Sequence, residues 1–322
     1  MPDPLDPNLQ KALTESQKII LISLKALTSQ SSSSHSSSSS SIQSGLGDAF
    51  QQLLNQLRQS ITVLGLSFNP PITIKAAIKE LNKISENIGQ LISCILISNL
   101  SSLLFEEWKF GIINIIEEVI KHIKVLENQD DYLSSTGKVW ESIDNLLNDL
   151  SKDEQSALRK KWKIHQSTVK DAWSEFKEIL ENQGDSEDPL NDGWDELDLG
   201  GEELSEDERK RAEAAKPLLA LHQILHATIP RFINQLTEDQ YRPILAISTN
   251  FVDAYDDAVS SMHPGQDEPE IEEALIQLED ISRQLAGKIQ DPSVDKWVER
   301  LEIEQKKWEE RRLDLKTLKN AL

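Results

Sequence analysis

Two histidines have the spacing that could hold a metal ion. His222 and His226 are four residues apart, which places both imidazoles on one face of a helix. A zinc protease of this pattern needs a glutamate directly after the first histidine to deprotonate the metal-bound water, and Gln223 stands there instead. Two imidazoles supply only half of a zinc site. The sequence therefore favours ordinary histidines on a helix face over a metal centre.

The only cysteine and the most acidic segment are the other candidates for chemistry. Cys94 lies in an apolar helical stretch with no nearby histidine or cation to stabilise a thiolate, so we expect a buried, inert thiol. If residues 183–208 formed a calcium loop around Gly193, Leu190 and Leu199 would stand where oxygen ligands are needed. We therefore expect no catalytic residues, no cofactor and no bound metal, and a protein that is not an enzyme.

An aromatic motif inside the acidic segment is the candidate for partner binding. It consists of Asp192, Trp194, Asp195, Glu196 and Leu197. A tryptophan and a leucine are unexpected among so many acids, because solvated segments are poor in large apolar residues. An aromatic anchor flanked by charge can dock into a groove on a basic surface. Two interpretations stay open: the tryptophan docks into a partner, or it packs back onto the chain's own helices.

Composition narrows the class of partner. The chain has 322 residues, with 55 Asp and Glu against 34 Lys and Arg, and the resulting net charge of −21 disfavours DNA binding. One cysteine cannot form an intrachain disulfide, and Met1–Pro4 lacks the basic start of a signal peptide, so we expect a reduced, intracellular compartment. The basic cluster 159–163 has two open interpretations, a nuclear-import signal or a solvated helix face.

The elements that carry these residues are predicted to be helices. Apolar residues recur with the helical period, as at Val139, Ile143 and Leu146, and no segment keeps the period of two that strands require. Gly and Pro make up 24 of 322 residues, against about 12% in average chains, which favours long helices with few connections. The pattern predicts ten helices, near residues 8–28, 46–66, 73–99, 103–128, 132–150, 152–182, 205–235, 238–262, 269–287 and 293–318.

Helix starts and one long uncharged run refine this prediction. Capping boxes are expected where Ser or Thr precedes Glu or Gln by three residues, at Ser151, Ser205 and Thr237. The uncharged run 87–105 is almost long enough to span a bilayer. Eight of its residues are Asn, Gln, Ser or Gly, whose polar groups would lack water in hydrocarbon. A buried bundle helix is therefore favoured over a membrane span.

Long helices with short connections pack best as antiparallel bundles. Residues 29–44 are rich in serine, which buries too little apolar area to order a chain, so a disordered loop is expected there. Residues 183–204 are strongly acidic and extend by self-repulsion. We predict an all-α fold of two helical bundles, residues 1–182 and 205–322, joined by an acidic linker at 183–204.

Several short motifs resemble a known family. The segment 136–141, Thr-Gly-Lys-Val-Trp-Glu, is similar to the T-G-x-V-W-E segment of the cyclin-D-interacting proteins, also described as maternal Id-like proteins. Pro70-Pro71, Cys94 in an apolar helix and the acidic Asp-Gly-Trp-Asp-Glu linker follow the same order. The family often has a tyrosine and two prolines at a later turn, where this chain has His263 and a single Pro264.

The resemblance implies bundles akin to those of vinculin and talin, and a regulator that binds D-type cyclins and helix-loop-helix transcription factors. It implies that the protein restrains proliferation and transcription without contacting DNA, in both nucleus and cytoplasm. We therefore expect protein partners and no nucleic acid, membrane or small-molecule substrate. The alternative, from a different class, is a cytoskeletal or scaffold adaptor of the vinculin type.

Overall fold

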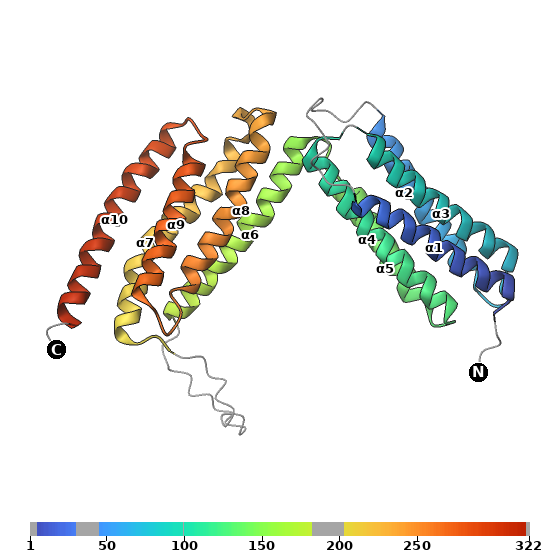
Figure 1. Cartoon of the computed structure of the whole chain (residues 1–322), viewed down its shortest axis with the longest axis horizontal. Helices are drawn as coiled ribbons and strands as arrows, with labels where there is room; N and C mark the ends of the chain where they lie inside the picture. Colours follow the sequence, from blue (N-terminus) through green and yellow to red (C-terminus); the bar gives the residue numbers. More distant parts are fainter. Residues whose placement is uncertain (1–4, 30–44, 99, 182–202, 320–322) are drawn as a thin grey trace, which may run out of the picture. The chain divides into compact units, whose positions relative to one another are not determined.

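The computed structural model describes residues 5–29, 45–98, 100–181 and 203–319, and side chains among them as far as residue 313. The described residues form ten α-helices and two short 3-10 turns, with no strand among them (Figure 1). This architecture confirms the predicted all-α fold. Nine of the ten helices begin and end within two residues of the predicted ranges.

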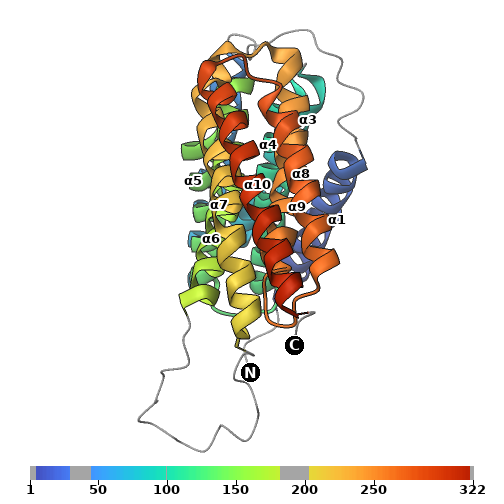
Figure 2. The same cartoon turned by 90° about the vertical axis from the view of Figure 1, so that its left-hand side faces the viewer.

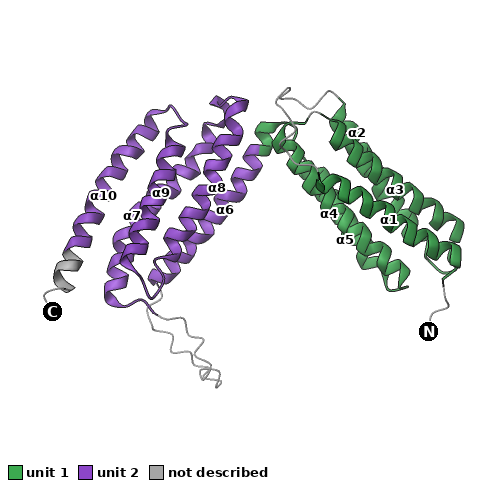
Figure 3. Ribbon diagram, viewed as in Figure 1, with its two compact units in different colours: residues 1–157 green, residues 158–322 purple. Residues whose placement is uncertain are grey.

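The first compact unit, residues 1–157, contains the first five helices of the chain (Figure 3). Its helices are α1 (Pro7–Ser29), α2 (Leu46–Ser67), α3 (Ile74–Ile97), α4 (Ser102–Glu127) and α5 (Tyr132–Asp149). Contacts run from α1 to α3, α2, α5, α4 and back to α1, so the helices close around one core. Within that core, the Phe50 and Trp108 rings stack at a centroid distance of 4.2 Å, and both side chains are fully buried.

The second compact unit, residues 158–322, contains the remaining helices. They are α6 (Glu154–Glu181), α7 (Glu206–Thr228), α8 (Glu238–Ser260), α9 (Glu268–Ala286) and α10 (Pro292–Lys319), with turns η3 (Ile229–Arg231) and η4 (Ile233–Gln235). Helix α7 contacts α8, α9 and α10, and α8 contacts α9. Figures 1 and 2 show α6–α10 running along a common direction.

The position of α6 corrects the predicted domain boundary. The compact units divide between Ala157 and Leu158, whereas the sequence placed all of residues 1–182 in the N-terminal bundle. The Trp162 ring of α6 stacks on His226 of α7 at 4.8 Å, so most of this helix belongs to unit 2. The prediction followed the acidic run in the sequence, but the face that α6 buries is decided by helices that come later in the chain.

Two helix ends differ from the sequence pattern for local reasons. Helix α7 ends at Thr228 rather than near residue 235, next to Pro230, which has no amide hydrogen to donate to a continuing helix. The chain continues there as the two 3-10 turns. Helix α6 starts from a cap in which Asp153 accepts from the Ser156 amide at 2.7 Å, whereas the predicted cap, Ser151, donates its own amide to Glu107.

The other two predicted caps are present. Ser205 and Glu208 form a capping box at the start of α7. At the start of α8, the Thr237 amide donates to Gln240 Oε1 at 2.9 Å. These local bonds explain why the beginnings of both helices were predictable from four-residue patterns.

The uncharged run 87–105 divides between two helices, because α3 ends at Ile97 and α4 begins at Ser102. None of the helices within the described ranges is long and apolar enough to cross a bilayer. The predicted serine-rich loop and acidic linker fall almost entirely outside the described residues.

Candidate functional site

The two histidines with metal-ligand spacing lie in the core of unit 2 and point to different helices. His222 and His226 are only 2% and 1% exposed. His222 Nδ1 lies 2.8 Å from Ser282 Oγ on α9, and His226 Nε2 lies 2.8 Å from Ser248 Oγ on α8. They are therefore buried core residues. Over the part of the chain that the structure describes, no three His, Cys, Asp or Glu side chains gather as a metal site.

A third histidine joins the same network. His165 Nδ1 on α6 also lies 2.8 Å from Ser248 Oγ, so one hydroxyl connects two imidazoles. Serine has a single proton to donate, so Ser248 donates to one imidazole and accepts from the N–H of the other. In this arrangement the imidazole that accepts from Ser248 is neutral, and the other imidazole donates its N–H to the hydroxyl. The network joins α6, α7 and α8.

Burial fixes the charge state of these histidines. It lowers the pKa of His222 to about 3, with a smaller contribution from Arg283, and it lowers the pKa of His226 to about 3, with a smaller contribution from His165. In unit 1, burial lowers the pKa of His122 to about 4. Neutral imidazoles cost less to bury than charged ones, which is why the core accepts them.

Aromatic rings surround the network and complete the core. His226 lies between the Trp162 ring at 4.8 Å and the Phe251 ring at 4.7 Å, with both rings stacked on it. The Trp297 ring of α10 meets His222 edge-on at 5.8 Å, and its Nε1 donates to the Leu221 carbonyl at 2.7 Å. The imidazoles therefore hold α6, α7, α8 and α10 together, and their polar contacts are internal.

Cys94 is half-buried rather than buried. It lies on α3 beside an open hollow that Gly89, Ile97 and Leu46 also line. Burial raises the pKa of its thiol, so the thiolate is disfavoured, as expected of an unreactive cysteine.

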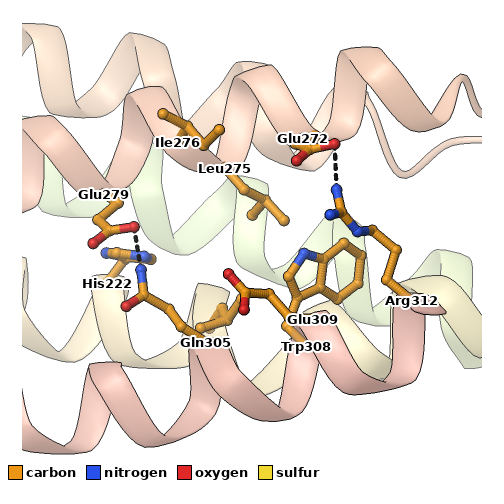
Figure 4. A pocket seen from close by; sticks show the side chains of 10 residues that line it. His222, Glu272, Leu275, Ile276, Glu279, Gln305, Trp308, Glu309 and Arg312 are labelled. Atoms are coloured by element: carbon orange, nitrogen blue, oxygen red, sulfur yellow. Dashed lines mark hydrogen bonds and ion pairs between the residues drawn. The ribbon is translucent and has the colours of Figure 1, made fainter.

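A small cavity of about 100 Å³ lies among α7, α9 and α10 of unit 2 (Figure 4). Leu218 and His222 of α7 contribute to its lining, together with side chains from α9 and α10. On the α10 side Trp308 lines the cavity and is 8% exposed. Pockets for drug-sized ligands usually measure about 300–1,000 Å³, so this cavity suits a single side chain rather than a small molecule.

Two polar bridges span the cavity from α9 to α10 (Figure 4). Arg312 forms an ion pair with Glu272, and Gln305 Nε2 donates a hydrogen bond to Glu279. Glu279 also accepts from Arg283 Nε at 2.6 Å on its own helix. Helix α7 packs on both α9 and α10, so it forms the floor beneath these bridges. We call this cavity, together with the α9 and α10 side chains that line it, the groove.

The outer side of the α9 wall is acidic with one exposed isoleucine. An open hollow of about 610 Å³ is lined by eight residues of α9, three of which are carboxylates and none of which is a cation. The carboxylates are Glu272, Glu273 and Asp280. Ile276 belongs to both the hollow and the groove, and its side chain is 53% exposed. Carboxylates around an exposed isoleucine can bind a protein surface that is positively charged and partly apolar.

Sequence reasoning did not find this groove. The predicted partner-binding residues Asp192, Trp194, Asp195, Glu196 and Leu197 lie outside the described residues. The sequence does hold one signal, because Ile276 falls outside the buried α9 stripe, to which Leu275 and Leu278 belong. An apolar residue on the polar side of a helix can mark a contact surface, although single exposed residues are common.

One comparison with known proteins gives a match. Among curated proteins, none matches this chain. A family model described as Grap2 and cyclin-D-interacting, N-terminal, matches residues 49–182. The match includes the segment 136–141 that carries the resemblance, and it extends through α6, beyond the end of unit 1. Residues 49–182 are therefore similar to the N-terminal region of the Grap2 and cyclin-D-interacting family, in agreement with the resemblance that the sequence motifs carry.

Proposed function

We propose that this protein is an interaction regulator that binds a D-type cyclin. The observation that carries the proposal is the family match over residues 49–182, whose description names cyclin D interaction. The matched residues form nearly all of α2 and the whole of α3–α6. A rigid helical surface of this kind suits recognition of another folded protein.

We further propose that binding regulates the cell cycle and transcription, with helix-loop-helix factors as a second class of partner, in nucleus and cytoplasm. The sequence resemblance supports this finer role. The net charge of −21 supports action on proteins rather than on DNA. The polar contacts of His222 and His226 are used inside the core, which supports a role by contact rather than by catalysis.

The direct test is titration of purified full-length chain with a purified D-type cyclin, followed by calorimetry. Saturable binding is expected, and a cyclin of another class serves as the matched control and should bind at least about tenfold more weakly, a difference of about 1.4 kcal/mol. Absence of heat with the D-type cyclin at concentrations of tens of micromolar would contradict the proposal.

Exposed apolar side chains in the matched segment offer a way to locate the contact. Leu66, Ile97, Phe110, Leu133 and Ile164 are between 59% and 81% exposed, so their replacement by alanine should leave the fold intact. Loss of cyclin binding in one of these variants, with unchanged circular dichroism, would mark the surface. Full binding by all five would place the contact elsewhere.

A second measurement distinguishes the regulator from the alternative, a cytoskeletal adaptor. Co-sedimentation of the purified chain with actin filaments would favour the adaptor. Cyclin binding without co-sedimentation would favour the regulator.

A further inference from the structure

We propose that the groove between α9 and α10 in unit 2 is a docking site for a basic amphipathic helix of a partner protein. The inference rests on the proposed function only in assuming that this protein works through partners. It adds a surface outside the segment that the family model matches, and it states the chemistry of the partner that binds there.

The walls of the groove are held apart by side chains. Helix α7 packs on both α9 and α10, while the link between α9 and α10 includes the two bridges, Arg312 to Glu272 and Gln305 to Glu279 (Figure 4). The side chains of these two bridges could instead form hydrogen bonds with polar groups of a bound helix. The cavity beneath, about 100 Å³, is smaller than the roughly 150 Å³ cavity that holds a benzene ring, and so fits one aliphatic side chain.

The apolar part of the surface is centred on Ile276. This side chain is 53% exposed and is shared by the cavity and by the open hollow on α9. Leu275 of α9 and Trp308 of α10 also line the cavity, so both walls offer apolar atoms to the stripe of an amphipathic helix.

The charge pattern selects a basic partner. Glu273 precedes Ile276 by about one turn, and Asp280 follows it by one turn, whereas Glu272 is already paired with Arg312. Glu273 and Asp280 are seven residues apart, which is about 10.5 Å along the helix. A partner helix with lysine or arginine one turn on either side of a leucine would meet carboxylates at both positions.

The same charge pattern argues against a second copy as the occupant. Each chain carries a net charge of −21, so two copies repel one another. The eight residues that line the hollow include three carboxylates and no cation, so a second α9 would set like charges together. A basic helix from another protein is the occupant that satisfies both the apolar and the charged parts of the surface.

The test uses a fluorescent peptide of about 21 residues, composed of leucine and lysine in amphipathic helical order, and the full-length chain. A second peptide has glutamate in place of every lysine. Fluorescence anisotropy should show saturable binding of the lysine peptide and no binding of the glutamate peptide. No binding of the lysine peptide would overturn the proposal, as would equal binding of both.

Matched variants locate the binding. The double variant Glu273→Lys with Asp280→Lys should weaken binding at least about tenfold. Asp256→Lys with Asp257→Lys changes the net charge equally on exposed positions of α8 and should change the affinity less than about twofold. Equal losses in both variants would show attraction to the whole acidic chain and would overturn the proposal.

The apolar contact has its own control. Ile276→Ala should weaken binding about three- to tenfold, whereas Ile224→Ala, at a position 56% exposed on α7, should leave it unchanged. Dimers of the free chain that Ile276→Ala dissolves would make a second copy the occupant, against the proposal. None of these measurements uses a cyclin, so failure of cyclin binding and failure of this site are observed separately.

Discussion

A single hydroxyl organises the core of unit 2. Ser248 is fully buried and lies 2.8 Å from both His165 Nδ1 and His226 Nε2. Leaving a buried polar atom without a hydrogen-bond partner costs about 1–3 kcal/mol of folding free energy. Ser248 therefore stabilises the fold mainly by giving a partner to each of two histidine nitrogens. The stacked rings of Trp162 and Phe251 fix His226 between them, which leaves the imidazole no freedom to seek another partner.

Replacing this hydroxyl should destabilise the protein strongly for so small a change. We predict that Ser248→Ala lowers the free energy of unfolding by about 2–4 kcal/mol, because two nitrogens lose their partner. The matched control is Thr249→Ala, the neighbouring and exposed position, where a change within about 0.5 kcal/mol is expected. Urea denaturation followed by circular dichroism measures both. Equal effects in the two variants would mean that the network contributes nothing.

The buried histidines also predict a dependence on pH. The pKa of His222 and of His226 is lowered to about 3 from the ordinary 6.5, so the unfolded chain binds their protons first as the pH falls. Their contribution to stability is complete above about pH 6.5 and is lost progressively towards pH 3. Between pH 8 and pH 5 each should cost about 2 kcal/mol of unfolding free energy.

Urea denaturation at pH 8, 6.5 and 5 tests this expectation. A His222→Gln variant should be less stable at every pH but should have a shallower decline, because one of the shifted histidines is gone. A decline as steep as that of the unaltered chain would argue that other groups cause it.

Gln223 argued against a protease motif at these histidines, but nothing in the sequence predicted that they are buried. Their burial depends on Ser248 and Ser282, which are 22 and 60 residues away from the histidines they contact. Serine is common on helix surfaces, so nothing local distinguishes these two. The burial of these histidines depends on how several helices pack together, so it cannot be predicted from the sequence of one helix.

At the scale of the helix, α4 and α5 approach closely at a glycine. A Cβ at Gly111 would lie 2.5 Å from Leu146 Cδ1 and 3.2 Å from its Cγ, which is too close for the leucine to stay in place. At Gly137 on α5, no atom lies within 4 Å of such a Cβ. Both glycines thus lie in helices, but a methyl group has no room at Gly111 and has free space at Gly137.

We predict opposite effects of alanine at these positions. Gly137→Ala should raise the free energy of unfolding by up to about 1 kcal/mol through helix propensity. Gly111→Ala should gain the same propensity but lose about 1–3 kcal/mol as Leu146 is displaced, so the net change is zero or destabilising. Thermal denaturation compares them, and an equal rise in Tm would show that α4 and α5 tolerate the extra methyl group.

Helix positions were predictable because their causes are local. Apolar spacing placed α5, and its predicted stripe, Val139, Ile143 and Leu146, is buried. The end of α7 was misplaced by seven residues although Pro230 stood in the sequence, because the apolar period continued through Ile233. The groove was not predictable, since it depends on how far apart α9 and α10 lie on α7.

For the whole molecule, two ways of dividing the chain disagree. The contacts divide it after Ala157, while the family match runs from residue 49 to residue 182. The segment that the family model matches therefore includes the part of α6 whose buried side chains contact α7 and α8. Trp162 is the clearest example, because it is 0% exposed and its Nε1 donates to the carbonyl of His226.

A fragment that ends at residue 182 should therefore expose apolar surface. We predict that residues 1–182 bind the dye ANS more strongly than the full chain does, because Trp162 and its neighbours lose their cover. Tryptophan emission should also be shifted to longer wavelength, and a Trp162→Phe fragment should lack that shifted part. A compact monomeric fragment that binds no dye would mean that α6 finds another surface within residues 1–182.

The family match and the compact units thus divide this polypeptide at different residues. The matched stretch ends in a helix whose buried aromatic face is covered by residues outside that stretch. A polypeptide cut at residue 182 keeps the whole of α6 but loses the side chains of α7 and α8 that contact Trp162 and His165.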